Sequence, residues 1–172
     1  MNLISFSGSC QLNDKWSIRT GIGFIYDGKL KPNNQSAHNV KPGGVFTVGF
    51  EYLSHRGEGY IPYLDYSVFL SGSSTKTENP VNRNKTNYFS SDLRLGGRAS
   101  WDINGNIFPY LTGRIFGGPV HWKINETDVT GTDIHHFQFA IGSAIQFGRI
   151  GTFVEWAGLG EKAFSFGMSY SF

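Results

Sequence analysis

The sequence predicts an all-β protein in which residues 1–172 form a single antiparallel up-and-down β-barrel domain. Large apolar and small polar residues alternate through most of the chain, the pattern of strands that have one apolar and one polar face. The connections between these segments are short and long in alternation along the chain, as they are in up-and-down barrels. Finally, aromatic residues reach 16% and charged residues only 16%, against about 25% charged residues in ordinary soluble domains.

Nine segments alternate in this way, and no segment shows a helical period. In chain order they cover residues 3–12, 16–26, 44–53, 60–72, 88–101, 107–117, 136–147, 151–157 and 163–172. Each is identified by apolar residues at every second position. In the same order these include Ile4 and Phe6; Ile18, Ile22 and Phe24; Phe46, Val48 and Phe50; Leu64, Val68 and Leu70; Leu93 and Leu95; Leu111 and Ile115; Phe139, Ile141 and Ile145; Val154; and Phe166 and Met168.

The connections fall into two groups. Tight turns are expected at residues 13–14, 56–59, 104–105 and 148–149, and long loops at 27–43, 73–87 and 118–135. Asn104-Gly105 is the strongest turn signal, because both residues tolerate the positive φ of a two-residue hairpin. In a membrane barrel the short turns lie on the periplasmic side and the long loops outside.

The apolar face of the predicted strands has aromatic residues near its two ends and aliphatic residues between them. This arrangement is typical of paired interface girdles, in which aromatic rings lie at the level of the lipid headgroups. The predicted girdle residues are Trp16, Tyr26, Tyr52, Tyr60, Phe89, Trp101, Phe137, Phe147 and Trp156. All eight lysines fall in turns, loops or strand ends, as expected where a lipid-facing lysine at the midplane would cost about 2–4 kcal/mol.

The opposite face is small and polar and contains four charged residues of each sign. The balance predicts a plugged interior held by ion pairs, since arginine pairs bidentately with carboxylates where water is scarce. A soluble barrel would instead carry lysine and glutamate along its outer face. The predicted ion-pair network consists of Arg19, Glu51, Asp65, Asp92, Arg94, Arg98, Arg114 and Glu155.

The last nine residues, 164–172, alternate without a break and end on Phe172, with an aromatic residue two positions earlier. This segment resembles the closing strand of small bacterial outer-membrane β-barrel proteins. The resemblance implies an outer-membrane location in a Gram-negative bacterium, contact with outer-membrane lipid and lipopolysaccharide, and recognition by the outer-membrane assembly machinery. The implied assembly signal consists of Phe164, Phe166, Met168, Tyr170 and Phe172.

Nine strands is an odd number, whereas single-chain bacterial barrels have an even number. Two alternatives follow. Either the segment 3–12 pairs with a further strand upstream, which gives a barrel of ten strands, or the barrel has eight strands and begins at Trp16, with the segment 3–12 as a periplasmic or accessory strand.

The sequence leaves several function classes open. The net charge of +2 and the scattered lysines exclude a nucleic-acid-binding surface. A structural or surface-binding protein that uses its polar outer loops, for an extracellular ligand that the sequence does not identify, is the main expectation. The alternatives are a lipid-modifying enzyme of the lipid A acyl-transfer or deacylation type and a narrow channel. We expect no cofactor and no metal site, and the weak catalytic candidates are His121, Asp128, Asp133 and His136.

Overall fold

A computed structural model describes residues 2–31, 37–81, 83–124, 127–132, 136–160 and 162–170. The described residues form strands joined by turns. Within these ranges, no helix is long and apolar enough to cross a membrane. The long strands of the described chain are β1 (Asn2–Gln11), β2 (Trp16–Asp27), β5 (Gly43–His55), β6 (Tyr63–Glu78), β7 (Lys85–Ser100), β8 (Ile107–Gly117), β11 (Phe137–Phe147), β12 (Ile150–Gly160) and β13 (Ala163–Tyr170).

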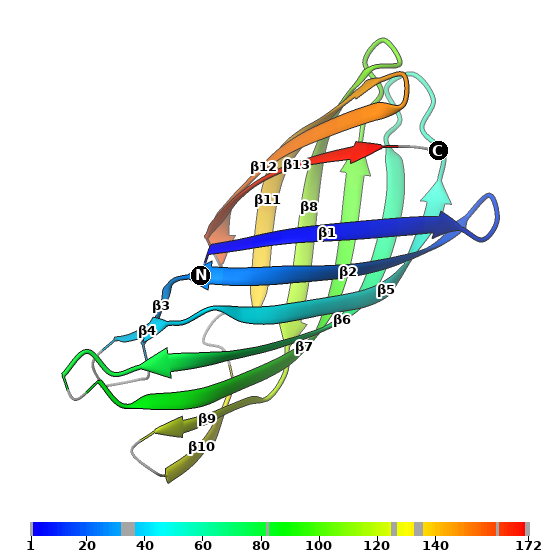
Figure 1. Cartoon of the computed structure of the whole chain (residues 1–172). Coiled ribbons are helices and arrows are strands. Elements are labelled where there is room, and N and C mark those ends of the chain that lie inside the picture. Colours follow the sequence, from blue (N-terminus) through cyan, green and yellow to red (C-terminus); the bar gives the residue numbers. More distant parts are fainter. Residues whose placement is uncertain are drawn as a thin grey trace.

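Each long strand pairs antiparallel with the one before it, in the order β1-β2-β5-β6-β7-β8-β11-β12-β13. The sheet curls into a half-barrel (Figure 1). The predicted all-β class and the antiparallel up-and-down topology are therefore confirmed. β1 pairs with β2 along its whole length, so the segment predicted at 3–12 belongs to the same sheet as the other long strands.

The sheet is open in the described part of the chain, where no ladder of hydrogen bonds joins β1 to β13. Each pair of neighbours is antiparallel, so the first and the ninth long strands point in the same direction, as Figure 1 shows. An antiparallel ladder cannot form between two strands with the same direction. Within the described residues the sheet is accordingly a half-barrel.

One end of the sheet has short connections, between residues 11–16, 55–63, 100–107 and 147–150; we call it the short-turn end. The predicted Asn104-Gly105 turn is present, with φ values of 61° and 70° at its two residues. Asp102 supports it, since its Oδ1 accepts a hydrogen bond from the Gly105 N–H at 2.6 Å. The turn region before β6 is longer than expected: β6 begins at Tyr63, so Tyr60 lies in a turn, 98% exposed.

The opposite end, which we call the long-connection end, contains more strand than the sequence predicts. The expected loop at 73–87 is largely a continuation of β6 and β7, while β3 (Lys29–Leu30) and β4 (His38–Val40) lie in the first expected loop and β9 (Val120–Ile124) and β10 (Thr127–Gly131) in the third. Hydroxyl groups stabilise the extended hairpin across its two strands: Ser73 Oγ lies 2.7 Å from Ser90 Oγ, and Thr77 Oγ1 lies 2.9 Å from Thr86 Oγ1. In this part of the hairpin, polar residues occupy both faces of the strands. The alternation of apolar and polar residues by which strands are predicted is therefore missing.

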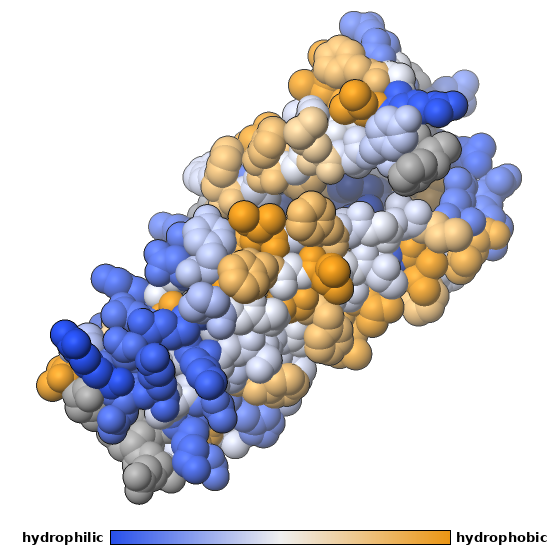
Figure 2. All heavy atoms as spheres, viewed as in Figure 1, coloured by the Kyte–Doolittle hydropathy of each residue, from blue (hydrophilic) through white to orange (hydrophobic). Residues whose placement is uncertain are grey.

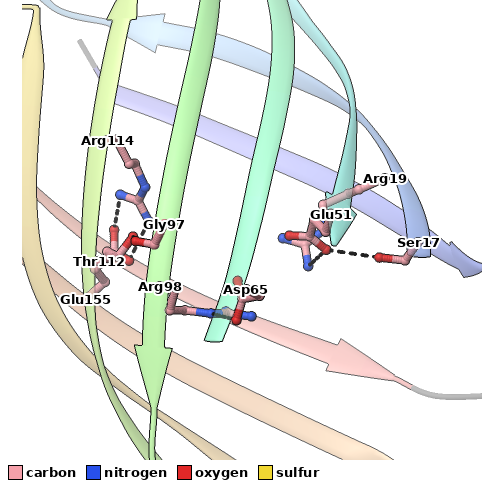
Figure 3. Close-up of polar contacts among 9 residues, drawn as sticks. All are labelled: Ser17, Arg19, Glu51, Asp65, Gly97, Arg98, Thr112, Arg114 and Glu155. Atoms are coloured by element: carbon pink, nitrogen blue, oxygen red, sulfur yellow. Dashed lines mark hydrogen bonds and ion pairs between the residues drawn. The ribbon is translucent and has the colours of Figure 1, made fainter. Parts of the chain in front are cut away.

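The two faces of the half-barrel differ in composition. The convex face exposes large apolar side chains from all the long strands, and Figure 2 shows these orange side chains along the body of the sheet, with hydrophilic residues gathered at the long-connection end. The concave face carries paired arginine and carboxylate side chains from the long strands (Figure 3). The described chain buries few large apolar side chains, so its largest apolar surface faces outward.

Candidate functional site: the concave face and the long-connection end

The best-connected ion pair on the concave face joins β8 to β12 across β11. Arg114 binds Glu155 bidentately, with Nη1–Oε1 and Nη2–Oε2 distances of 2.7 Å each, and Nη1 also donates to Gln138 Oε1 at 2.8 Å. Glu155 is 8% exposed. Since the two parallel hydrogen bonds fix both side chains, this pair ties together three strands of the sheet (Figure 3).

Two further pairs connect neighbouring strands nearer the short-turn end. Arg98 Nε donates to Asp65 Oδ2 at 3.0 Å, and these residues are partners in the β6–β7 register. The Arg98 guanidinium also lies 5.7 Å from the centre of the Tyr110 ring. Arg19 Nη2 lies 3.1 Å from Glu51 Oε2 (Figure 3).

The fourth pair, between Asp92 and Arg94 on β7, is looser. Arg94 Nη2 lies 3.7 Å from Asp92 Oδ2, and within the described residues neither Asp92 Oδ2 nor Arg94 Nε has a hydrogen-bond partner. The Arg94 guanidinium lies 5.3 Å from the centre of the Phe116 ring, a cation–π contact. The eight charged residues named from the sequence thus lie in four pairs of opposite charge.

Aromatic side chains also occupy the concave face, which the sequence pattern described only as small and polar. Tyr110 and Phe116 on β8 are buried and contact Arg98 and Arg94 respectively. A Cβ atom at Gly142, on the neighbouring strand β11, would collide with the Tyr110 ring. The missed signal was the pairing of an aromatic residue with a glycine one strand away, which only the strand register reveals.

Two cavities flank the Arg98–Asp65 pair at the short-turn end of the concave face. One has a volume of about 280 Å³ and extends towards Tyr63 and Phe108; the other has about 290 Å³ and extends towards Ser9 and Trp16. Both are lined by Leu53, Asp65 and Arg98. The Arg98–Asp65 pair therefore lies between the two cavities.

The predicted girdle residues lie mostly on the exposed surface. Trp16 and Tyr52 are register partners at the short-turn end, with ring centres 4.7 Å apart. Trp101 Nε1 donates to the Tyr60 carbonyl at 3.2 Å, which connects two of the short turns. The remaining members are exposed; they are Tyr26, Phe89, Phe137, Phe147 and Trp156.

The closing-strand residues fall on one side of β13. Phe164, Phe166, Met168 and Tyr170 are all exposed, and serine and glycine alternate with them. Phe172 lies outside the described residues.

The weak catalytic candidates do not form a catalytic arrangement in the described structure. His121 on β9 lies with its Nδ1 3.4 Å from Thr130 Oγ1 and stacks on Phe89, whereas Asp128 on β10 is the register partner of Lys123. His136 precedes β11 and accepts a hydrogen bond from the Phe116 N–H through its backbone carbonyl. Asp133 lies outside the described residues. Among the described side chains, no group of three or more His, Cys, Asp or Glu residues is placed to hold a metal ion.

A buried cluster at the long-connection end was not anticipated from the sequence. Its centre is Trp122 on β9, whose Nε1 donates to Thr77 Oγ1 at 2.8 Å and whose ring meets the rings of His38 and Tyr88 edge-on, at centre distances of 5.0 and 5.7 Å. Trp122, Thr77, His38 and Tyr88 come from four different strands and are all buried. We call these four residues the Trp122 cluster.

His38 is the titratable member of the Trp122 cluster. It is 3% exposed, and its Nδ1 has no hydrogen-bond partner within the described residues. Burial lowers the pKa of its ring below the ordinary histidine value, because an apolar environment disfavours the charged form. Beside it, Lys41 Nζ pairs with Glu78 Oε2 at 2.9 Å and fastens the chain after β4 to the end of β6.

A comparison of the chain with protein-family models gave no match, and a comparison with curated proteins gave none either.

Proposed function

We propose that this chain is a bacterial outer-membrane β-barrel protein that acts as a structural or surface-binding protein through its long-connection end. The observation that carries the proposal is the distribution of side chains over the two faces. The convex face exposes apolar residues along all the long strands, whereas the concave face carries four pairs of oppositely charged residues. This is the inverse of a protein that buries its apolar side chains and presents its charges to water.

The long-connection end supports the binding part of the proposal. The described part of this end forms a folded platform, because the Trp122 cluster and the Lys41–Glu78 pair hold β4, β6, β7 and β9 together. The hairpin of β9 and β10 projects from this platform, with His121, Lys123 and Asp128 exposed on it. Loops held on a rigid scaffold are the usual place of recognition.

The membrane placement can be tested with two matched substitutions of valine by lysine. Val68, in the middle of β6, is 46% exposed, and Val81, in the turn after β6, is 84% exposed. In a bilayer, Val68→Lys is expected to cost about 2–4 kcal/mol of folding free energy, because its charge enters hydrocarbon, whereas Val81→Lys is expected to have little effect. Folding is measured in lipid vesicles by urea titration and by heat-modifiable gel migration.

Equal tolerance of the two lysines would contradict the proposal, since both valines are accessible from outside. A chain that folds as a monomer in plain buffer, without detergent or lipid, would contradict it as well.

A narrow channel is the second candidate, favoured by the two cavities beside Arg98 and Asp65. If the pair gates a conduction path, Arg98→Ala should raise the single-channel conductance in planar bilayers. No change in conductance on removal of this arginine would argue for a purely structural ion pair.

A further inference from the structure

The two edges of the sheet, β1 and β13, border a seam that no described residue fills. Figure 2 shows the surface hollowed along the line where Figure 1 places these two strands. Both edges present large apolar side chains on their convex side. These include Ile4 and Phe6 on β1 and Phe166 and Met168 on β13.

The concave side of the seam is small and polar. Ser9 and Gln11 line the cavity next to Arg98, and the alternation of β1 places Ser5 and Ser7 on the same face. On β13, residues 165, 167 and 169 are serine, glycine and serine. The seam thus continues the two-faced pattern of the rest of the sheet, with apolar residues outward and small polar residues inward.

The direction of the edge strands limits what can close the seam. β1 and β13 both run from the long-connection end to the short-turn end (Figure 1). Direct closure would therefore need a parallel ladder. A second copy in the same membrane would have the same orientation, so it would also offer only parallel pairing at both seams. One inserted strand that runs the other way, in contrast, pairs antiparallel with both edges, as the eight pairs of neighbouring long strands already do.

Closure matters because the edges carry unpaired backbone groups. In hydrocarbon, each unsatisfied N–H or C=O group costs several kcal/mol, and open sheet edges do not occur there. β1 has 10 residues and β13 has 8, so a strand of similar length would satisfy both edges.

We propose that the seam is the docking site of one further β-strand, antiparallel to β1 and β13, with apolar residues outward and small polar residues inward. The strand runs from the short-turn end to the long-connection end. Its carboxyl end then lies beside Asn2, so we assign it to the same polypeptide, joined to β1 by a turn. This inference rests on the proposed membrane placement, because water could satisfy both edges of a protein in solution.

The test supplies such a strand and asks whether both edges become protected. The chain is extended at its amino end by a copy of residues 66–73, Tyr-Ser-Val-Phe-Leu-Ser-Gly-Ser, followed by Asn-Gly and then Asn2. This segment of β6 runs in the required direction, alternates and carries no charge. The matched control has the same eight residues with the members of each neighbouring pair exchanged, so that the two faces are swapped.

Hydrogen exchange of the two edges in detergent micelles is the readout. With the extension, the amides of both β1 and β13 should exchange about tenfold more slowly or better than in the 172-residue chain, as expected for hydrogen-bonded strands. The face-swapped control should leave both edges unprotected. Protection of neither edge by the extension, or equal protection by the control, would overturn the proposal.

Cross-linking provides a second measurement that does not depend on the extension folding into place. Cys10 is exposed on β1, and Met168→Cys or Phe166→Cys adds a partner thiol on β13. Adjacent strands lie about 4.8 Å apart, and strands separated by an inserted one lie about twice as far apart. In the extended chain, a linker of about 10 Å should join the two thiols while direct disulfide formation stays slow.

Rapid disulfide formation within one chain that the extension does not slow would indicate direct closure and overturn the proposal. Disulfides between copies would identify a second copy as the occupant and overturn it too. Both of these outcomes contradict only the docked strand, and the protein would still show heat-modifiable folding in detergent. Loss of that folding would contradict the proposed membrane placement.

Discussion

At the residue scale, the closest partner of the Glu155 carboxylate is the Arg114 guanidinium. Its carboxylate is buried and accepts two hydrogen bonds of 2.7 Å from Arg114. A buried charge that loses its partner is strongly destabilising, whereas replacing both members with apolar residues often is not. Removal of Arg114 alone should therefore destabilise the protein more than replacement of both residues by apolar ones.

Arg114→Ala should destabilise the folded protein by about 3 kcal/mol, because it leaves the Glu155 carboxylate unpaired. Arg98→Ala should cost less, since the Arg98 side chain is 41% exposed and water can screen Asp65. Urea unfolding in lipid vesicles measures both, with Arg149→Ala in an exposed turn as the control.

The double variant Arg114→Met, Glu155→Leu should be closer to the wild-type stability than Arg114→Ala alone. If the single and double variants are equally unstable, the cost arises from packing and not from the uncompensated carboxylate.

His38 makes the long-connection end sensitive to pH. Its folded-state pKa is lowered, so between that pKa and about 6.5 the unfolded chain binds more protons than the folded one. The stability contributed by the neutral ring is complete above pH 6.5 and declines as the pH falls towards the folded-state pKa. Hydrogen exchange of the β4 and β9 amides, corrected for intrinsic rates, should therefore accelerate between pH 7.5 and 5.5.

In the variant His38→Phe this acceleration should disappear. The Lys41–Glu78 pair titrates separately, because the hydrogen bond from Lys41 lowers the pKa of Glu78 below 4.5. The stability from that pair is present above pH 4.5 and is lost only as the pH falls through the lower value. An unchanged pH response in His38→Phe would mean that another group controls the opening of the Trp122 cluster.

At the scale of elements, the hairpin of β7 and β8 depends on its turn. Gly105 has φ +70°, a left-handed conformation that costs a residue with a Cβ atom about 1–2 kcal/mol. Gly105→Ala should lower the stability by about that amount. Gly113, in the middle of β8, has ordinary strand geometry and open space at its Cβ position, so Gly113→Ala should be neutral or slightly stabilising.

Equilibrium unfolding of the two variants, measured under identical conditions, distinguishes them. If Gly113→Ala is the more harmful of the two, turn conformation does not explain the position of Gly105.

Some strands follow directly from the sequence pattern and others do not. Strands with a continuous apolar face, such as β2 and β8, were predicted to within a residue at most of their ends, because burial in a two-faced sheet demands period two. The extensions of β6 and β7 were not predicted, since their hydroxyl groups pair across strands without any apolar face. Strand pairs of that kind are set by register, which a single sequence does not reveal.

The same limit applies to the candidate site. Balanced charge along one face of the predicted strands indicated eight residues, and the structure arranges these residues in four pairs of opposite charge. The assignment of partners was not predictable, because Arg114 reaches over β11 to Glu155. The Trp122 cluster joins residues from β4, β6, β7 and β9, whose contacts arise only when the chain has folded.

At the scale of the whole molecule, the proposed membrane placement depends on which medium meets each face. The half-barrel exposes apolar side chains on its convex surface and pairs charges on its concave surface. This arrangement is stable where hydrocarbon covers the convex face. It also requires the seam between β1 and β13 to be filled, since the unpaired edges would otherwise meet lipid.

The most direct test is a scan of lipid accessibility along β6. In a Cys10→Ser background, single cysteines at residues 66–71 carry a spin label, and collisions with lipid-soluble oxygen and with a water-soluble nickel complex are compared in vesicles. If lipid covers the convex face, oxygen accessibility is high at Tyr66, Val68 and Leu70 and low at Ser67, Phe69 and Ser71. Preferential collision of the labels at 66, 68 and 70 with the water-soluble complex would contradict the membrane placement.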